Sequence, residues 1–243
     1  MPLYYEAFLK HSAQKQVAAL IDPEKAEEKY LWELIQVAKA TQLDWFFVGG
    51  STVMFEDLDR VVRFLKGNSA IPVILFPGSA NQLHPKADAI LFMSLLSGRN
   101  PTYLIDEQKK AAQAVFDTKI GVIPTAYILI ASGSQSTTAR VSDTMPIEQL
   151  EEARHTALAG QYMGMQAVYL EAGSGSVETI KTDWIMDIRK HLSTKLVVGG
   201  GIKDGSTAKA IVDAGADVVV VGNALENKPQ LLSEICAAVK IKV

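Results

Sequence analysis

Hydrophobic residues along this chain fall into short runs that are separated by longer amphipathic stretches. Within the runs they do not alternate with polar residues, which is typical of strands buried on both faces of a parallel sheet. Between the runs apolar residues recur at helical spacing, as Leu31, Leu34 and Ile35 do. The pattern predicts alternating strands and helices. The strands are expected at residues 17–21, 45–48, 73–76, 89–93, 121–130, 167–170, 196–198 and 217–221.

The predicted helices follow the strands with one exception. They are expected at residues 24–41, 55–65, 102–116, 146–163, 177–191 and 229–239, with a further one around Ala208 and Ile211. Between the third and fourth strands the chain reads PGSANQLHPKAD, which is too short for a crossover helix and is bracketed by Pro77 and Pro85. A loop or brief extended piece is therefore expected to replace the third helix and to leave a side opening.

Two details of the fifth strand and its connection are also predicted. Pro124 cannot donate a ladder hydrogen bond, so it is a point at which the fifth strand can split. The polar segment at residues 132–144 is expected to form the longest loop of the chain.

Eight strands with helices between them fit a closed α/β fold, the (β/α)₈ or TIM barrel. The chain has 243 residues, close to the usual size of about 250 for that fold, and its hydrophobic content of 48% can fill a barrel. We therefore predict a modified TIM barrel without its third helix, in which residues 1–243 form a single domain.

Charge and cysteine content narrow the partners and the compartment. The formal net charge is -3 and the basic residues are scattered, so no nucleic-acid partner is expected. The single Cys236 excludes a disulfide within the chain, which suits a reducing cytoplasm. Glu6, Lys10 and His11 interrupt the N-terminal apolar residues, so we expect neither a signal peptide nor, elsewhere, a transmembrane segment.

Glycines follow the last two strands. Gly199, Gly200 and Gly201 end the seventh strand and Gly222 ends the eighth, each before a helical segment. Glycine lets backbone N–H groups approach an anion, and the N-terminus of a helix favours negative charge. The alternative is that these glycines only make tight turns. Two such turns on consecutive strands favour a phosphate site, because these loops bind phosphate in many TIM barrels.

The sixth strand ends in the sequence YLEAGSG, which places Glu171 beside this predicted phosphate site. A carboxylate next to bound phosphate is electrostatically costly, so Glu171 is a candidate general base for a hydroxyl of a phosphorylated substrate. The alternative is a rim glutamate that caps the following loop.

Two hard oxygen ligands, Asp22 and Ser51, are expected at the tips of the first two strands. They are too few to hold a metal alone, but Mg²⁺ commonly takes one or two carboxylates together with substrate phosphates and water. A Mg²⁺–diphosphate complex therefore fits, and helix capping by both residues is the alternative. The four histidines show no ligand spacing, so zinc is not expected.

Large apolar residues gather near strands three to five and beside the missing helix. Most are expected in the core, yet the gap next to them can also form a groove for a long apolar tail. The residues concerned are Phe76, Leu83, Phe92, Leu95, Leu96, Tyr103, Leu104, Tyr127 and Ile128.

Six motifs in this order resemble the geranylgeranylglyceryl phosphate synthases, a family that includes bacterial heptaprenylglyceryl phosphate synthases. The resemblance spans nearly the whole chain. The motifs are IDPEK (residues 21–25), VGGS (48–51), LFPGS (75–79), YLEAGSG (169–175), VGGGI (198–202) and GNALE (222–226).

The resemblance implies Mg²⁺-dependent transfer of a prenyl group, geranylgeranyl in most of the family, from its diphosphate to the 3-hydroxyl of sn-glycerol 1-phosphate. It implies that Asp22 and Ser51 hold Mg²⁺, that Glu171 is the base with Tyr169 beside it in the catalytic group, and that the protein is a homo-oligomer, a dimer or a hexamer. The residues it assigns to glycerol phosphate are Tyr169, Leu170, Glu171, Ala172, Gly173, Ser174, Gly175, Gly200, Gly201, Gly222 and Asn223.

Parts of the chain are not covered by the resemblance. The loop at residues 131–140 does not match the family pattern, so no role is carried over to it. Arg99 suits a diphosphate contact by its guanidinium geometry, with an exposed helix-capping arginine as the alternative. Two other functions stay open: another phosphate-binding TIM-barrel enzyme, such as a sugar-phosphate isomerase or aldolase, and a non-enzymatic barrel that senses a phosphorylated metabolite.

Overall fold

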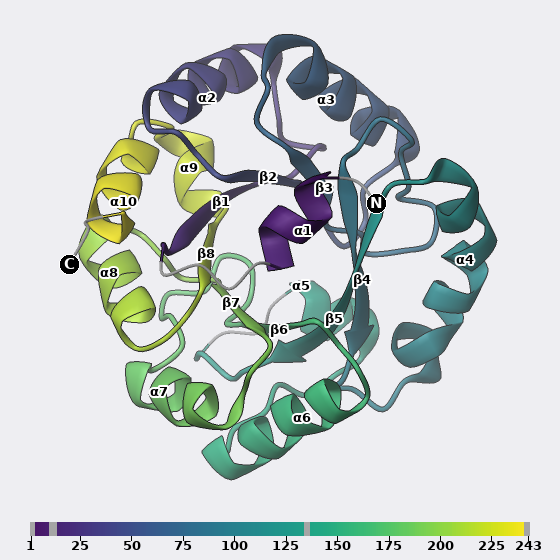
Figure 1. Ribbon diagram of the computed structural model, residues 1–243, viewed down its shortest axis with the longest axis vertical. Helices are drawn as coiled ribbons and strands as arrows, with labels where there is room; N and C mark the ends of the chain where they lie inside the picture. The colour runs from purple at the N-terminus through teal and green to yellow at the C-terminus, as the bar shows by residue number, and fades with distance from the viewer. Residues whose placement is uncertain (1–2, 10–13, 134–136, 241–243) are drawn as a thin grey trace.

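A computed structural model describes residues 3–9, 14–133 and 137–240 of the chain. Its eight strands are all parallel and pair in sequence order to close a barrel (Figure 1). The predicted (β/α)₈ fold is therefore confirmed. The strands are β1 (Gln16–Ile21), β2 (Trp45–Val48), β3 (Val73–Leu75), β4 (Ala89–Leu95), β5 (Gly121–Leu129), β6 (Ala167–Glu171), β7 (Lys195–Gly199) and β8 (Val218–Val221).

Helices form a ring around the barrel (Figure 1). Their apolar stripes face inward as the periodicity predicts: Leu31, Leu34 and Ile35 are at most 1% exposed. After β4 the chain passes through a π-helical turn, η1 (Thr102–Asp106), before α4. The ring consists of α2 (Glu28–Ala40), α3 (Phe55–Asn68), α4 (Glu107–Thr118), α6 (Leu150–Tyr162), α7 (Thr182–His191), α8 (Gly205–Asp213) and α10 (Leu231–Val239).

The connection between β3 and β4 has no helix, as predicted. Residues 76–88 cross from one strand to the next as a loop, and α3 and α4 stand on either side of it in the ring (Figure 1). The loop ends at Asp88, whose carboxylate accepts hydrogen bonds from the Lys66 ammonium at 2.8 Å and from the Val73 amide. The third helix of the regular barrel is therefore replaced by a fixed loop.

Two expectations for the fifth strand and its connection were wrong. β5 runs unbroken through Pro124, which pairs with Phe92 of β4. The Pro124 carbonyl accepts from the Gln166 amide, and β6 begins only at Ala167, so no strand lies opposite the missing N–H. Residues 132–144 are not only loop either, because they contain the short helix α5 (Thr137–Ser142).

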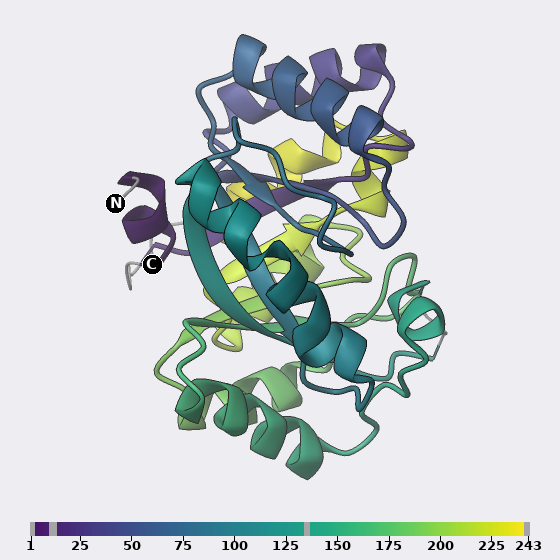
Figure 2. The same ribbon diagram turned by 90° about the vertical axis from the view of Figure 1, so that its right-hand side faces the viewer.

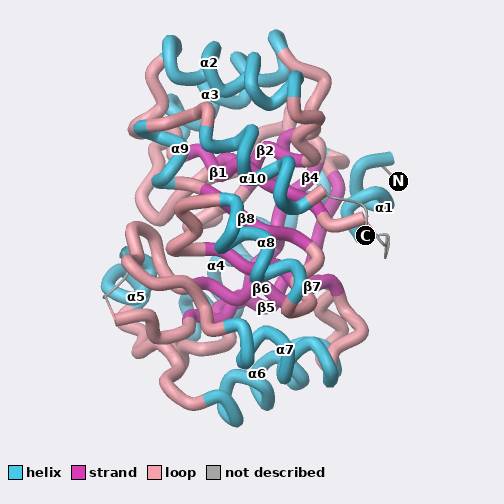
Figure 3. Tube along the Cα trace, turned by 90° about the vertical axis from the view of Figure 1, so that its left-hand side faces the viewer, coloured by secondary structure: helices cyan, strands magenta, loops and turns pink. Residues whose placement is uncertain are grey.

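Two further short helices were not predicted. α9 (Asn223–Asn227) begins directly after Gly222. α1 (Leu3–Leu9) closes the barrel at the end opposite to α5 (Figures 2 and 3), where the buried Phe8 ring meets the Trp45 ring edge-on at 5.5 Å. Lys10 and His11, used above in judging the N-terminus, lie outside the described residues. None of the helices described is long and apolar enough to cross a membrane.

The barrel interior is packed with side chains and is not a pore. Phe47, Ile74, Leu91, Tyr169 and Val197 belong to this inner layer and are at most 1% exposed, whereas a second apolar layer lies between strands and helices. A substrate can therefore bind only at an end of the barrel or in its side.

Candidate active site

A cavity of about 530 Å³ lies at the end of the barrel where the strands finish. Asp22 follows β1, Ser51 follows β2, Glu171 ends β6, and glycines follow β7 and β8. Because all eight strands are parallel, these tips meet at one rim. The acidic tip of the first strand and the glycine tips of the last strands therefore converge on one cavity.

Most of the predicted site residues line this cavity, but two do not. Leu170 is fully buried among residues that face the helices, and Ala172 is 2% exposed in the same layer. Their side chains alternate away from the cavity because neighbouring residues of a strand point to opposite faces. The residues that do line it are Asp22, Ser51, Tyr169, Glu171, Gly173, Ser174, Gly175, Gly200, Gly201, Gly222 and Asn223.

Glu171 is a buried carboxylate at the centre of the site. It is 6% exposed and pairs along the sheet with Leu129 on β5 and Gly199 on β7. Burial raises its pKa to about 7, against the opposing effect of the Gly173 N–H, which donates to Oε1 at 2.7 Å. Near neutral pH the carboxylate therefore exchanges readily between its protonated and ionised forms, as a general base requires.

The Tyr169 hydroxyl shares the space above Gly199 with this carboxylate. A Cβ atom on Gly199 would lie 2.3 Å from the hydroxyl oxygen and 3.1 Å from Glu171 Oε2. Burial raises the Tyr169 pKa well above its ordinary value, so the hydroxyl stays protonated. It is near enough to influence the pKa of Glu171, yet no described group stands in hydrogen-bonding geometry to it. Gly199 therefore makes room for the two side chains.

The glycine loops after β6 and β7 need glycine for their backbone conformation. Gly173, Gly200 and Gly201 have φ angles of 104°, 88° and 71°, which side-chain-bearing residues rarely adopt. In the described structure the N–H groups of Gly200 and Gly201 donate to no protein acceptor. These glycines do make tight turns, as the alternative states. The turns also leave the N–H groups of Gly200 and Gly201 free to bind an anion.

The two outer loops of this region are joined across the mouth of the barrel. Ser174 Oγ lies 3.1 Å from Asn223 Oδ1, which links the loop after β6 to the start of α9. Gly222, between β8 and α9, has no atom closer than 3.6 Å to the place of a Cβ. A Cβ on Gly222 would therefore make only ordinary contacts with Leu20, whereas on Gly200 or Gly201 it would clash.

Asp22 and Ser51 lie on neighbouring loops at the other side of the cavity. Asp22 Oδ1 accepts from the Glu24 amide at 3.2 Å, and Oδ2 is 3.1 Å from the Lys25 ammonium. The Asp22 carboxylate also lies beside Gly50, since its Oδ1 is 3.8 Å from the Cβ position of that glycine. Ser51 Oγ is 3.4 Å from Thr138 Oγ1 of α5.

The capping alternative for these two residues was wrong. α2 begins at Glu28 with Glu27 at its N-cap, and α3 begins at Phe55 with Met54 there. Among the residues described, no three His, Cys, Asp or Glu side chains gather as a metal site. One carboxylate and one hydroxyl fit a Mg²⁺ ion that takes its other ligands from a substrate diphosphate and water.

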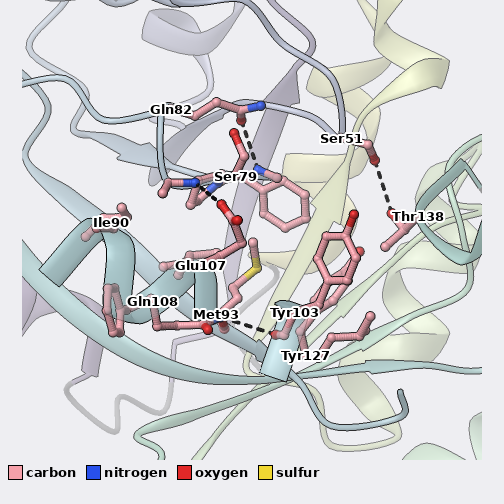
Figure 4. A pocket seen from close by; sticks show the side chains of 18 of the residues that line it. Ser51, Ser79, Gln82, Ile90, Met93, Tyr103, Glu107, Gln108, Tyr127 and Thr138 are labelled. Atoms are coloured by element: carbon pink, nitrogen blue, oxygen red, sulfur yellow. Dashed lines mark hydrogen bonds between the residues drawn. The ribbon is translucent and has the colours of Figure 1, made fainter. Parts of the chain in front are cut away.

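An apolar groove adjoins the cavity (Figure 4). It lies between residues 76–83 of the helix-replacing loop and the η1–α4 segment, which is the side opening expected from the missing helix. The two hollows share Gly50, Ser51, Phe76, Tyr127 and Thr138. Of the apolar residues predicted near strands three to five, those that line the groove are Phe76, Leu83, Phe92, Leu95, Tyr103 and Tyr127.

Lys203 and two serines are among the residues in or beside the site that the sequence analysis missed. Lys203 lines the cavity with its ammonium 3.1 Å from the Val177 carbonyl; its position just after the GGG turn was an available signal. Ser176 Oγ donates to Ser132 Oγ at 2.8 Å, and Ser132 donates to the Ala172 carbonyl, which supports the loop after Glu171. Nothing in the sequence marks these serines, since their contact spans 44 residues.

Arg99 lies away from the cavity. Its guanidinium donates to the carbonyls of Leu96 and Gly98, and it lines a separate surface hollow. Arg99 therefore neither lines the cavity nor caps a helix, because the carbonyls it binds belong to the turn after β4. Residues 134–136 of the unassigned loop lie outside the described part of the chain.

Comparison with known proteins assigns the family. The family model described as PcrB matches residues 11–240. A geranylgeranylglyceryl phosphate synthase of Zunongwangia profunda is 44% identical over 232 residues, which is 93% of this chain and 98% of the relative. Another from Pyrococcus horikoshii is 43% identical over 215 residues, 87% of this chain and 84% of the relative.

Solved structures agree with the sequence relatives. The crystal structure of (S)-3-O-geranylgeranylglyceryl phosphate synthase from Thermoplasma acidophilum, in complex with sn-glycerol-1-phosphate, superposes with a TM-score of 0.90 at 33% identity. The alignment covers 99% of each chain. The chain therefore belongs to the PcrB family, and it is a prenyltransferase of the geranylgeranylglyceryl phosphate synthase type.

Proposed function

We propose that this protein transfers a prenyl group from its diphosphate to the 3-hydroxyl of sn-glycerol 1-phosphate with the help of Mg²⁺. The ether oxygen is that of the glycerol hydroxyl, and diphosphate is released. One observation carries the proposal: Glu171, with a pKa of about 7, lines the glycine-rich cavity, and that cavity meets an apolar groove at Ser51 and Phe76.

Glycerol 1-phosphate is assigned to the side of the cavity formed by the loops after β6, β7 and β8. The free N–H groups of Gly200 and Gly201 suit its phosphate, and Gly222 lines the same side of the cavity. Lys203 adds a cation at the same edge. The Thermoplasma acidophilum relative was solved with sn-glycerol-1-phosphate, which supports this ligand.

The prenyl diphosphate is assigned to the groove and to the junction where the two hollows meet. The apolar tail is held along the groove, and its diphosphate reaches Ser51 and Asp22 at the junction. These two residues would hold Mg²⁺, which would supply positive charge to stabilise the leaving diphosphate. This arrangement brings the reacting ends of both substrates together near Glu171.

Glu171 takes the proton of the attacking hydroxyl. As the glycerol oxygen bonds to C1 of the prenyl group, the bond from C1 to the diphosphate oxygen breaks and the proton passes to the carboxylate. Tyr169 stands beside Glu171 as a neutral hydroxyl and narrows the space in which the glycerol hydroxyl approaches.

The groove argues against the alternative enzymes. An isomerase or aldolase acting on a sugar phosphate needs the phosphate loops but has no use for an apolar groove joined to the cavity. A non-enzymatic sensor is set aside because the chain belongs to a family of prenyltransferases.

A direct assay tests the proposal. The purified protein is incubated with radiolabelled sn-glycerol 1-phosphate, MgCl₂ and prenyl diphosphates of several lengths, and label is counted in the organic phase. We expect an extractable ether lipid that is lost on chelation of Mg²⁺ and absent when the enantiomer sn-glycerol 3-phosphate is supplied. Failure to form product with any prenyl length would refute the proposed function.

A further inference from the structure

The loop that replaces the third helix, residues 76–88, forms one wall of the apolar groove. At the rim it touches the loop that carries Ser51, since a Cβ on Gly78 would lie 2.5 Å from the Gly50 carbonyl oxygen and 2.7 Å from Ser51 Cα. The position of this wall therefore affects both the width of the groove and the place of a proposed diphosphate ligand.

Glu107 is the single charged side chain that lines the groove within the described chain. It belongs to the first turn of α4, and its side chain is 18% exposed. Its Oε2 accepts the Ala80 N–H of the wall at 2.6 Å (Figure 4). Its Oε1 accepts from the Lys110 ammonium at 2.6 Å. Both oxygens of the carboxylate are therefore engaged.

A carboxylate in an apolar groove loses hydration, which destabilises its ionised form. Burial alone would raise the pKa of Glu107. The hydrogen bonds from Lys110 and the Ala80 amide lower the pKa by more than burial raises it, so it lies below its ordinary value. The carboxylate thus stays ionised and retains its full strength as an acceptor for the wall. An apolar residue here would extend the groove but would leave the Ala80 amide without this partner.

The wall is anchored on its other side by a histidine. His84 is buried, its Nδ1 accepts the Lys86 N–H at 3.1 Å, and its Nε2 lies 2.9 Å from Asp59 Oδ1 of α3. This contact ties the wall to α3, whereas Glu107 ties it to α4. Of the two, only Glu107 faces the groove.

We propose that Glu107 is a positioning residue for the prenyl substrate: its bond to Ala80 N–H fixes the groove wall at the width and distance from Ser51 that the tail and diphosphate require. This inference rests on the proposed function for its substrate, but the bond itself is independent of it. Glu107 touches the wall and is not assigned to the reacting atoms.

Three substitutions separate this role from a general effect on folding. Glu107→Leu fills similar space and removes the acceptor, whereas Glu107→Gln keeps an amide oxygen for the Ala80 N–H. Lys110→Met is the matched control, because it removes the other partner of Glu107 and leaves the wall contact in place. Glu107→Ala replaces the leucine variant if that variant does not fold.

Hydrogen exchange tests, without any substrate, whether the bond from Glu107 to the Ala80 N–H fixes the wall. In Glu107→Leu we expect fragments covering residues 77–88 to exchange about tenfold faster or more, the factor expected when a bond to a charged group is lost. Trypsin should also cut faster after the exposed Lys86. The glutamine and Lys110 variants should stay close to wild type. Wild-type exchange in Glu107→Leu would overturn the proposal.

Steady-state kinetics tests the consequence for the substrate. We expect Glu107→Leu to raise KM for geranylgeranyl diphosphate about tenfold, again as for a lost charged bond, and to change KM for glycerol 1-phosphate by less than about twofold. A parallel rise in both KM values would contradict a positioning role. If wild-type protein itself forms no ether, the proposed function fails. The hydrogen-exchange comparison still tests whether Glu107 fixes the wall.

Discussion

Glu171 combines a functional advantage with a cost to stability. The proposed base must be ionised to accept a proton, and its pKa is about 7, so kcat/KM should fall as the pH drops below about 7. Glu171→Gln cannot accept the proton, and we expect turnover to fall about 100-fold or more with glycerol phosphate binding retained. A turnover assay together with calorimetric titration of glycerol 1-phosphate measures both. Unchanged turnover would remove Glu171 from its proposed role.

The same residue makes a prediction about folding. Its pKa is about 7 in the folded protein against an ordinary value of 4.5, so between these pH values the folded state holds a proton that the unfolded state has lost. Stability therefore falls as the pH rises through this window, by about 3 kcal/mol at most for 2.5 pKa units. Glu171→Gln should abolish this part of the pH dependence and be the more stable protein at pH 8 in urea denaturation. Equal stability of the two proteins at pH 8 would mean that the carboxylate is not desolvated.

Gly199 is predicted to be intolerant of any side chain. Its Cβ position lies 2.3 Å from the Tyr169 hydroxyl, so Gly199→Ala must displace that ring or the strand, at a typical cost of about 1–3 kcal/mol. Tyr169→Phe removes the atom in closest conflict. We therefore expect the double variant to recover part of the lost stability in thermal denaturation. Simple addition of the two single effects would exclude this contact as the cause.

At the scale of elements, the cap of α8 offers a test that is separate from catalysis. Asp204 accepts the Thr207 N–H at 2.7 Å and stands at the N-cap of α8, just beyond the glycine loop after β7. Asp204→Ala should lower stability by about 1 kcal/mol, the usual loss for a cap, with little change in kcat. A melting curve and a saturation assay check this. A large fall in kcat at unchanged stability would place Asp204 in the site instead.

Strong periodic elements were predictable from the sequence, and short ones were not. An apolar run predicted β2 at residues 45–48, because a strand buried on both faces is apolar throughout. Two prolines in a short connection predicted the missing third helix. α5 and α9 have six and five residues, too few for a periodic stripe. Pro124 lies within an unbroken strand because the neighbouring strand starts late, which is a property of the sheet and not of β5.

The candidate site follows the same division. Residues at strand tips, such as Asp22 and Glu171, could be placed together because parallel strands end at one rim. Contacts between segments that are far apart in the sequence could not be predicted. The Glu107 bond to Ala80 spans 27 residues and joins a helix to a loop, so neither partner carries a mark of it in the sequence.

At the scale of the whole molecule, α1 packs against one end of the barrel and the candidate active site lies at the other. Phe8 of α1 is fully buried against Trp45 and Phe47, at the end away from the cavity. Phe8→Ala should cost about 3–5 kcal/mol, as other large core truncations do, and leave both KM values unchanged. Chemical denaturation and steady-state kinetics on one preparation measure the two effects. A changed KM would show that the ends of the barrel are coupled.

The junction at Ser51 and Thr138 has a kinetic meaning for the proposed reaction. The cavity and the groove share these two residues with Gly50, Phe76 and Tyr127 and are otherwise lined by different residues, so each proposed reactant has its own compartment. Neither substrate has to depart before the other arrives, and no residue needs to carry the prenyl group in between. Such a layout favours a ternary complex with direct transfer over a ping-pong cycle through a modified enzyme.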